Sequence, residues 1–264
     1  MGRGVLIIAL GFILGCSNQR FYKSPWLVTE RDTARYLTDA LEHENADVRR
    51  DAIERLSKSR FIHHDLVVDA CSTIARTDSS EAVRVAAVRL IAEAGRPDSA
   101  AVLLSILDEA SRATRHSGAG PGDWVTTEVL HALYFLERND PIKKIHRDRV
   151  VGTALRLLRG DPSREVRIAA AELLEVFPRR DVLDGLIAAL DQRDFGVVYT
   201  VERSLKRLTG MTYDHDLNRW QDWLAAADDP FARRGELDDA SQTESEPNWW
   251  RRTVGSVRRA FTGS

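Results

Sequence analysis

The chain has 264 residues, of which 43% are hydrophobic and 30% are charged, and its formal net charge is −2. This balance is that of a globular protein rather than a disordered one, and a charge near zero argues against attraction of the whole protein to nucleic acid. Strong helix formers dominate the middle of the chain, and no stretch alternates polar and apolar residues as a strand would. The sequence therefore predicts an all-α fold.

Residues 1–15 are typical of a secretory signal peptide. Arg3 is followed by a run of ten apolar residues at 5–14, which is too short to span a bilayer as a mature helix. The run ends in Ile13-Leu14-Gly15-Cys16, which resembles the lipobox of bacterial lipoproteins. The resemblance implies cleavage before Cys16 and acylation of its thiol. The alternative is an ordinary signal peptide followed by a chance cysteine.

Residues 16–30 show no hydrophobic period, and we expect them to form a tether between the membrane and the domain. In the lipoproteins that this segment resembles, an aspartate after the acylated cysteine often marks retention at the inner membrane. Ser17 occupies that position here. We therefore expect a lipid-anchored, extracytoplasmic protein of a bacterial membrane, on the periplasmic face of the outer membrane where the cell has one.

Between residues 31 and 227, apolar stripes alternate with short polar turns, and this pattern predicts five pairs of helices. The predicted pairs are 32–42 with 46–57, 65–76 with 80–93, 98–112 with 122–137, 147–159 with 162–177, and 181–190 with 194–208. The second helix of each pair has a marker valine near its start, at Val48, Val83, Val125, Val166 and Val197. Consecutive markers lie 35, 42, 41 and 31 residues apart, the spacing of a repeat built from two helices.

In three copies an arginine follows the marker valine, and alanine, an apolar residue and leucine or isoleucine come next. The third and fifth copies have Val125-Thr126 and Val197-Val198 instead. Over about 32–210 the pattern resembles the HEAT-repeat family, which implies a right-handed α-solenoid of about five helix pairs with a capping helix. In such repeats the arginine usually contacts a neighbouring turn. We therefore assign the marker arginines Arg49, Arg84 and Arg167 to structure, with ligand binding as the alternative.

One position of each second helix is predicted to face solvent. On a helix that turns by about 100° per residue, the positions 0, +4, +5 and +8 from the marker valine fall on one apolar face, and the sixth residue after the valine lies nearly opposite this face. All five residues at this position are polar: Glu54, Arg89, His131, Glu172 and Arg203. We take them as the candidate partner-binding face, although a solvated face without a partner would show the same pattern.

Three further features belong to the repeat region. Residues 113–122 contain glycines but lack the phosphate-binding pattern, so we predict a flexible insertion rather than a phosphate cradle. Leu208-Thr209-Gly210 followed by Trp220-x-x-Trp223 resembles the closing element of many bacterial HEAT domains, and we expect the tryptophans to pack over the last pair. Cys71 lies among apolar residues and is predicted to be buried, with a reactive thiol as the alternative.

The last part of the chain changes sign along its length. Residues 228–248 are predicted to be an acidic, disordered linker, and residues 249–264 form a short basic tail. Apolar residues at helical spacing together with arginines are typical of a segment that binds a membrane surface or a partner groove. The residues concerned are Trp249, Trp250, Arg251, Arg252, Val254, Val257, Arg258, Arg259 and Phe261. A disordered tail without a target is the alternative.

No motif for catalysis or metal binding is present. The chain has no His-Glu-x-x-His sequence and no paired cysteines, and His43-Glu44 is its one pair of the kind that HEAT-like metal hydroxylases repeat. We expect no cofactor, no metal and no enzymatic activity. The leading hypothesis is a membrane-anchored scaffold that binds an unknown envelope protein. The alternatives are an envelope enzyme or lyase with a site in the solenoid groove, and a purely structural envelope component.

Overall fold

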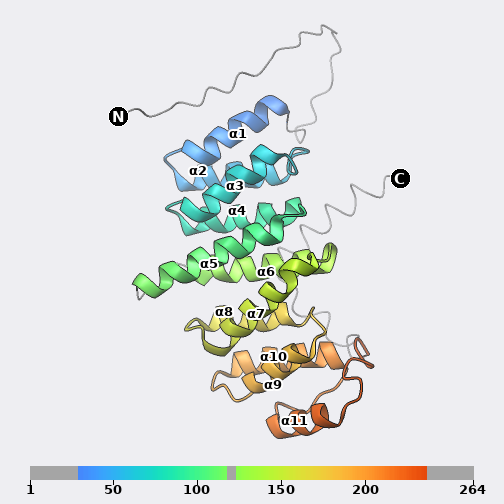
Figure 1. Ribbon diagram of the computed structural model, residues 1–264. Coiled ribbons are helices and arrows are strands. Elements are labelled where there is room, and N and C mark those ends of the chain that lie inside the picture. Colours follow the sequence, from blue (N-terminus) through green and yellow to red (C-terminus); the bar gives the residue numbers. More distant parts are fainter. Residues whose placement is uncertain (1–28, 118–122, 237–264) are drawn as a thin grey trace, which may run out of the picture.

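The structure is a computed structural model, and it describes residues 29–117 and 123–236 (Figure 1). Over these two ranges the chain forms helices and turns without any strand, which confirms the predicted all-α fold. The helices found there are α1 (Glu30–Glu42), α2 (Ala46–Ser57), α3 (Asp65–Thr77), α4 (Glu81–Ala94), α5 (Ser99–Ser117), α6 (Asp123–Asn139), α7 (Lys144–Gly160), α8 (Arg164–Leu174), α9 (Arg180–Ala189), α10 (Phe195–Thr209) and α11 (Leu217–Ala226). The predicted signal peptide, Cys16 and the basic tail lie outside the described residues.

The helices pack as successive pairs, in two layers. Each odd-numbered helix from α1 to α9 contacts the even-numbered helix that follows it. The even-numbered helices also contact one another in order from α2 to α10, and the odd-numbered helices do so from α1 to α11. Figure 1 shows the pairs following one another from α1 at one end of the molecule to α11 at the other. The core therefore lies between the layers and runs along the whole stack.

Small and branched side chains allow the even-numbered helices to sit close together. In α8 the buried residues are Val166, Ala169, Ala170, Ala171, Leu173 and Leu174. An alanine adds no side-chain volume beyond one methyl group, so a helix rich in alanine can contact its own partner and both neighbouring even helices. The marker valines are buried in four pairs. Val48, in the first pair at the N-terminal end of the stack, is partly exposed.

Most predicted helix ends lie within three residues of the observed ones, and the differences follow from local capping. The second helix of the fourth pair was predicted to begin at Pro162, but α8 begins at Arg164. The hydroxyl of Ser163 accepts a hydrogen bond from the Val166 amide and so fixes the start of the helix after the proline. The same helix ends at Leu174, three residues before its predicted end.

The predicted insertion at 113–122 is wrong in its first half. Helix α5 continues to Ser117, because no glycine or proline interrupts the chain before Gly118. Residues 118–122 of the predicted insertion lie outside the part of the chain that the structure describes.

The two ends of the stack differ in how well they are covered. At the first end, α1 buries only Thr33 and Ala40. At the other end, α11 packs on α9, and the indole of Trp220 is 0% exposed. The rings of Tyr213 and Trp220 meet edge to face with centroids 5.0 Å apart, and Trp223 packs on Trp220 in the same way at 5.5 Å. The tryptophans therefore pack, as predicted.

A buried carboxylate holds the segment before α11 against α10. Glu202 of α10 is buried, and its Oε1 accepts hydrogen bonds from the Thr212 hydroxyl (2.8 Å) and the Tyr213 amide (3.1 Å). Its Oε2 accepts from the His215 amide (3.2 Å) and the Trp220 indole (2.7 Å). Four donors on one carboxylate compensate for its burial, and they attach the closing segment to the last pair.

The chain after α11 turns back onto the end of α10. Gly210, which ends α10, has a φ of 68°, and a Cβ there would lie 2.1 Å from the carbonyl oxygen of Arg233. Only glycine fits both the left-handed backbone and this close approach. Pro230 is buried and Phe231 is half-buried, so residues 228–236 of the predicted disordered linker form turns that pack on the domain.

We predict that Glu202→Gln lowers the free energy of unfolding by about 2–4 kcal/mol, because an amide NH2 group would face two of the four donors. Urea denaturation followed by tryptophan fluorescence measures the effect. Asp222→Asn, at an exposed position of α11, is the matched control. Equal denaturation midpoints for the two variants would contradict the role assigned to Glu202.

Candidate functional site

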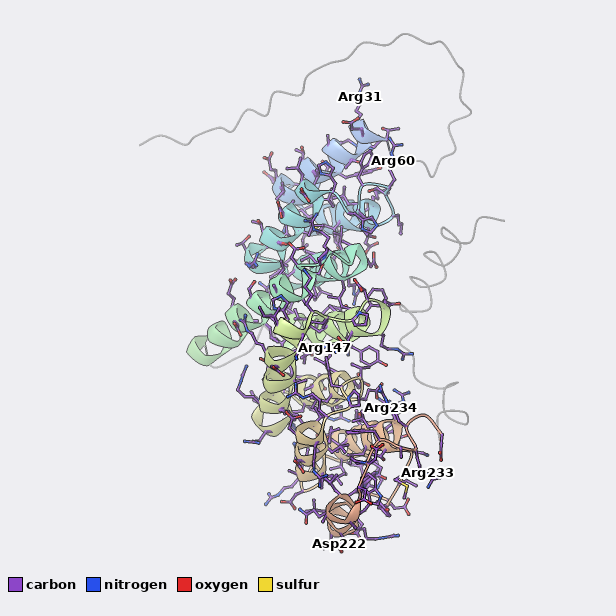
Figure 2. All side chains as sticks on the ribbon, turned by 45° about the vertical axis from the view of Figure 1, so that its right-hand side comes forward. Arg31, Arg60, Arg147, Asp222, Arg233 and Arg234 are labelled. Atoms are coloured by element: carbon purple, nitrogen blue, oxygen red, sulfur yellow. The ribbon has the colours of Figure 1, made fainter. Side chains whose placement is uncertain are left out.

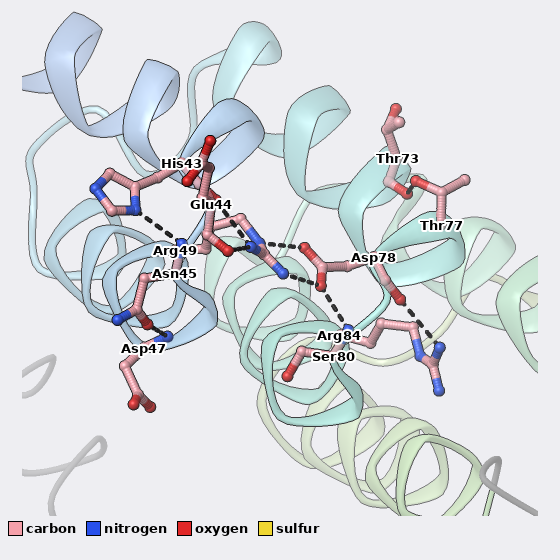
Figure 3. A network of polar contacts seen from close by, with 10 residues as sticks. All are labelled: His43, Glu44, Asn45, Asp47, Arg49, Thr73, Thr77, Asp78, Ser80 and Arg84. Carbon is pink, nitrogen blue, oxygen red and sulfur yellow. Dashed lines mark hydrogen bonds and ion pairs between the residues drawn. The ribbon is translucent and has the colours of Figure 1, made fainter.

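The marker arginines bond to the end of the first helix of their own pair, as Figure 3 shows for Arg49 and Arg84. Arg49 Nη1 donates to the His43 carbonyl at 2.8 Å, and Arg84 Nη1 donates to the Asp78 carbonyl at 3.0 Å. Arg167 Nη1 donates to the Asp161 carbonyl at 2.6 Å. Each acceptor is the C-cap residue of its helix, six positions before the arginine. The guanidinium groups therefore satisfy helix carbonyls that would otherwise lack a partner, the structural role that the sequence favoured.

Arg49 also connects the first pair to the second. Its Nε and Nη2 both donate to the Asp78 carboxylate, at 2.8 Å each, in the paired geometry that guanidinium and carboxylate favour (Figure 3). Asp78 Oδ1 additionally accepts from the Ser80 amide at 2.8 Å. Burial acts to raise the pKa of Asp78, but the hydrogen bonds from Arg49 and Ser80 outweigh it and hold that pKa below its ordinary value.

Four of the five predicted face residues are paired with one another or with a residue of the next even-numbered helix. Arg89 of α4 donates through Nε and Nη2 to the two carboxylate oxygens of Glu128 of α6, at 2.9 Å each. Glu172 of α8 lies between His131 of α6, at 3.4 Å, and Arg203 of α10, at 2.6 Å. Three of the five predicted residues thus meet in one cluster that joins three successive even-numbered helices.

Within this cluster the Glu172 carboxylate is paired with the Arg203 guanidinium. Burial acts to raise the pKa of Glu172, but hydrogen bonding by His131 and the charge of Arg203 outweigh it, and the pKa lies below its ordinary value. These side chains are partly exposed, so the cluster reaches the surface of the layer that the even-numbered helices form, here called the even layer. We call this set, together with Arg89–Glu128, the polar ladder, since each contact joins one even-numbered helix to the next.

A second row of contacts runs beside the polar ladder. Glu175 Oε1 accepts from the Tyr134 hydroxyl at 2.9 Å and from Arg207 Nη1 at 2.6 Å, and Arg138 donates to the same hydroxyl at 2.9 Å. Burial raises the pKa of Glu175, and Arg207 opposes that shift. Burial and the nearby charge of Glu175 raise the pKa of Tyr134 to about 12. A phenol of this kind remains protonated at neutral pH and acts as a donor.

Glu54 stands apart from the other four face residues. It is exposed, and its contact at 3.9 Å is with Arg50 of the same helix. Near it, Glu93 of α4 has its pKa raised to about 7, mainly by burial, while Ser57 and Arg89 partly oppose the shift. A carboxyl that titrates near neutral pH makes this end of the even layer sensitive to pH.

Several large apolar side chains of the even layer are exposed. Trp124, at the start of α6, is 70% exposed, and Phe195 and Tyr199 of α10 are 72% and 55% exposed. Exposed aromatic residues beside arginines are the composition that protein interfaces favour. The even layer therefore combines a locally neutralised polar ladder with aromatic groups that have lost little contact with water.

The carboxylate partners in these contacts were missed from the sequence. Asp78 and Asp161 share a signal, since each stands two residues before a serine that precedes a second helix and accepts a hydrogen bond from that serine's amide. Glu128 and Glu175 share none, because they occupy different positions in their helices and become partners only through the stacking of neighbouring pairs. The exposed aromatic residues also follow no repeated position.

The part of the chain described by the structure holds no group of three or more histidine, cysteine or acidic residues that could bind a metal ion. It also contains no helix with the length and apolar character needed to cross a membrane. Cys71 is buried as predicted, and burial raises the pKa of its thiol to about 12. A thiol with so high a pKa carries little thiolate at neutral pH.

Comparison of the chain with protein-family models and with curated proteins gave no match.

We predict that Asp78→Asn lowers the free energy of unfolding by about 2–3 kcal/mol at about pH 7. Asp78 has a lower pKa in the folded protein, so its contribution is present above the unfolded pKa of about 3.9 and is lost as pH falls through the folded pKa. Urea denaturation should show the variant and the wild type converging as the pH falls below the ordinary pKa of an aspartate. Asp69→Asn, exposed on the same helix, should change neither curve. A difference in the free energy of unfolding between wild type and Asp78→Asn that stays constant with pH would contradict the ion pair.

The stability contributed by Glu93 depends on pH in the opposite direction to that of Asp78. Its folded pKa is raised to about 7, so its protonated form stabilises the fold below the unfolded pKa of about 4.3, and that stability is lost as pH rises through about 7. We predict that Glu93→Gln raises the free energy of unfolding at about pH 8 by about 1–3 kcal/mol, so that the variant unfolds at a higher urea concentration than the wild type. At about pH 4 we expect little difference between the two. Glu42→Gln, at an exposed site, provides the control.

Proposed function

We propose that the protein is a membrane-anchored, non-catalytic HEAT-repeat scaffold that binds another protein of the bacterial envelope. In this proposal the stacked pairs are a right-handed α-solenoid of five HEAT-like units, and α11 is its capping helix. The even layer is the partner-binding side. The protein is held at the membrane by acyl chains on Cys16, with residues 16–30 as the tether.

The observation that carries the proposal is the repeated bond between a marker arginine and a C-cap carbonyl. It recurs in three pairs with the same spacing of six residues. A bond that returns at matching positions of separate pairs supports a true structural repeat, since each unit solves the same capping problem in the same way. Stacked repeats of this type present long surfaces that suit protein binding.

The even layer has the chemical character of a protein-binding surface. Trp124 and Tyr199 offer rigid aromatic area, and ordering them on binding costs little side-chain entropy. The polar ladder beside them is already paired, so a partner would not have to compensate isolated buried charges. These features support binding of a protein surface with its own apolar residues.

Cross-linking in intact cells tests the scaffold function. A photoreactive p-benzoylphenylalanine at position 124 of α6 should capture one envelope protein, identified by mass spectrometry. The matched control is the same residue at position 145 of α7, where Ile145 is 79% exposed on the odd layer. Capture of the same proteins from both positions, or of none from position 124, would reject the even layer as the binding side.

We predict that Cys16→Ala releases the protein from the membrane fraction, because loss of the acyl chains removes the apolar anchor. Cell fractionation with and without labelled fatty acid measures both location and acylation. Cys71→Ala serves as the control, since it removes the other cysteine and should leave both unchanged. A Cys16→Ala protein that stays with the membrane would show that another segment anchors the chain.

A further inference from the structure

Helix α10 carries an exposed stripe with two aromatic residues, next to the line on which Glu202 is covered by the closing segment. Phe195, Tyr199 and Lys206 fall within about 40° of one another around the helix and opposite the marker valine Val197. The rings of Phe195 and Tyr199 lie 6.2 Å apart, and both residues are exposed. We call this stripe, together with the partly exposed Ile168 of α8, the α10 face.

The two ends of the α10 face carry opposite charge. Basic groups outnumber acids at the C-terminal end of α10, where Figure 2 labels Arg233 and Arg234. The groups at this end are Lys206, Arg207, Arg233 and Arg234, against Glu175, Asp229 and Glu236. The Arg233 carbonyl packs against Gly210, which places the 233–236 turn at this end.

Carboxylates outnumber basic groups at the N-terminal end. The ring of His215 lies 6.0 Å from that of Phe195, so the segment after Gly210 runs back along the helix to its start. The groups at this end are Asp191, Asp194, Asp214 and Asp216, against Arg164, Arg193 and Arg219. Arg164 is itself bonded to Asp194 at 3.0 Å.

The chain that follows Glu236 has the complementary order of charge. Residues 237–248 contain Asp238, Asp239, Glu244 and Glu246 and no lysine or arginine, and the basic tail follows from Trp249. The acidic part therefore starts beside the basic end of the α10 face. A segment running back along α10 would then bring its arginines to the acidic end.

The segment 237–248 is long enough to reach from one end of α10 to the other. Helix α10 has 15 residues and is about 22 Å long. The segment 237–248 can span up to about 40 Å when extended. Trp249 and Trp250 can therefore reach Tyr199 or Phe195 without any rearrangement of the described domain.

We propose that residues 249–261 dock on the α10 face of their own chain. The apolar residues Trp250 and Phe261 cover Phe195 and Tyr199, and Arg258 and Arg259 lie against the acidic end. The acidic segment before them lies along Lys206 and Arg234. This assignment gives the basic tail an intramolecular target. The docked tail would occupy Tyr199, so it would compete with the partner for that part of the even layer.

An anionic membrane is the other target that the tail's arginines fit. The charge order favours the α10 face, because an acidic segment directly before the arginines would be repelled from an anionic surface. Against α10 both halves of the segment meet opposite charge.

Photo-cross-linking of the full-length protein tests the docking. With p-benzoylphenylalanine replacing Tyr199, we expect a cross-link to a peptide within 249–261, identified by mass spectrometry. The same residue replacing Trp124, which lies on α6 and is even more exposed than Tyr199, should give at least about five-fold less of it. Arg258→Glu with Arg259→Glu should lower the yield from position 199 by about five-fold, and neither change affects a buried residue of the described domain.

Three results would overturn the proposal. The first is no tail peptide cross-linked to position 199, or equal yields from positions 199 and 124. The second, in a mixture of isotopically light and heavy chains, is a cross-link that joins the two, since that assigns the face to a second copy. The third is loss of the cross-link on addition of phosphatidylglycerol vesicles with the tail bound to them, since that assigns the tail to the membrane.

Discussion

The fold depends on how each first helix ends. Three of the turns between paired helices contain only three residues, so the last carbonyls of the first helix lie close to the opening of the second. A guanidinium placed six residues after the C-cap satisfies those carbonyls and leaves the neighbouring valine facing the core. One bond thereby sets both the termination of one helix and the rotation of the next. The antiparallel pair is the result, and the rest of the stack is built by repeating it.

A second set of contacts determines how the pairs follow one another. Arg49 reaches Asp78 of the next pair, and in the even layer Glu172 joins α6 to α10 through His131 and Arg203. Partly buried ion pairs add little net stability, because desolvation offsets most of the attraction, but a wrong register would leave each charge without its partner. The polar ladder therefore acts mainly on specificity of stacking, while alanine-rich packing supplies most of the stabilisation.

Local patterns predicted the helices well because the 3.6-residue period and the turn residues act over short distances. The errors arose where a single cap decided a boundary, as at Ser163, or where a helix continued to the first glycine at Gly118. The rule of the sixth position found residues of the even layer, but except for Glu54 their partners lie 31 to 41 residues away in sequence. Such contacts depend on the angle and offset between neighbouring pairs, which no local pattern contains. The exposed aromatic residues of α10 were missed for the same reason.

Because its two ends are covered unequally, the stack should open more easily at its N-terminal end than at its C-terminal end. Helix α1 buries two residues, whereas the far end is closed by Trp220 and by the four bonds of Glu202. In a linear array each unit is held mainly by its neighbours, so local opening is cheapest where a terminal unit has least contact. A pulling force applied at the N-terminus would peel α1 from α2 and α3 long before it strained α10. The chain would thus lengthen near its start while the last pairs kept their shape.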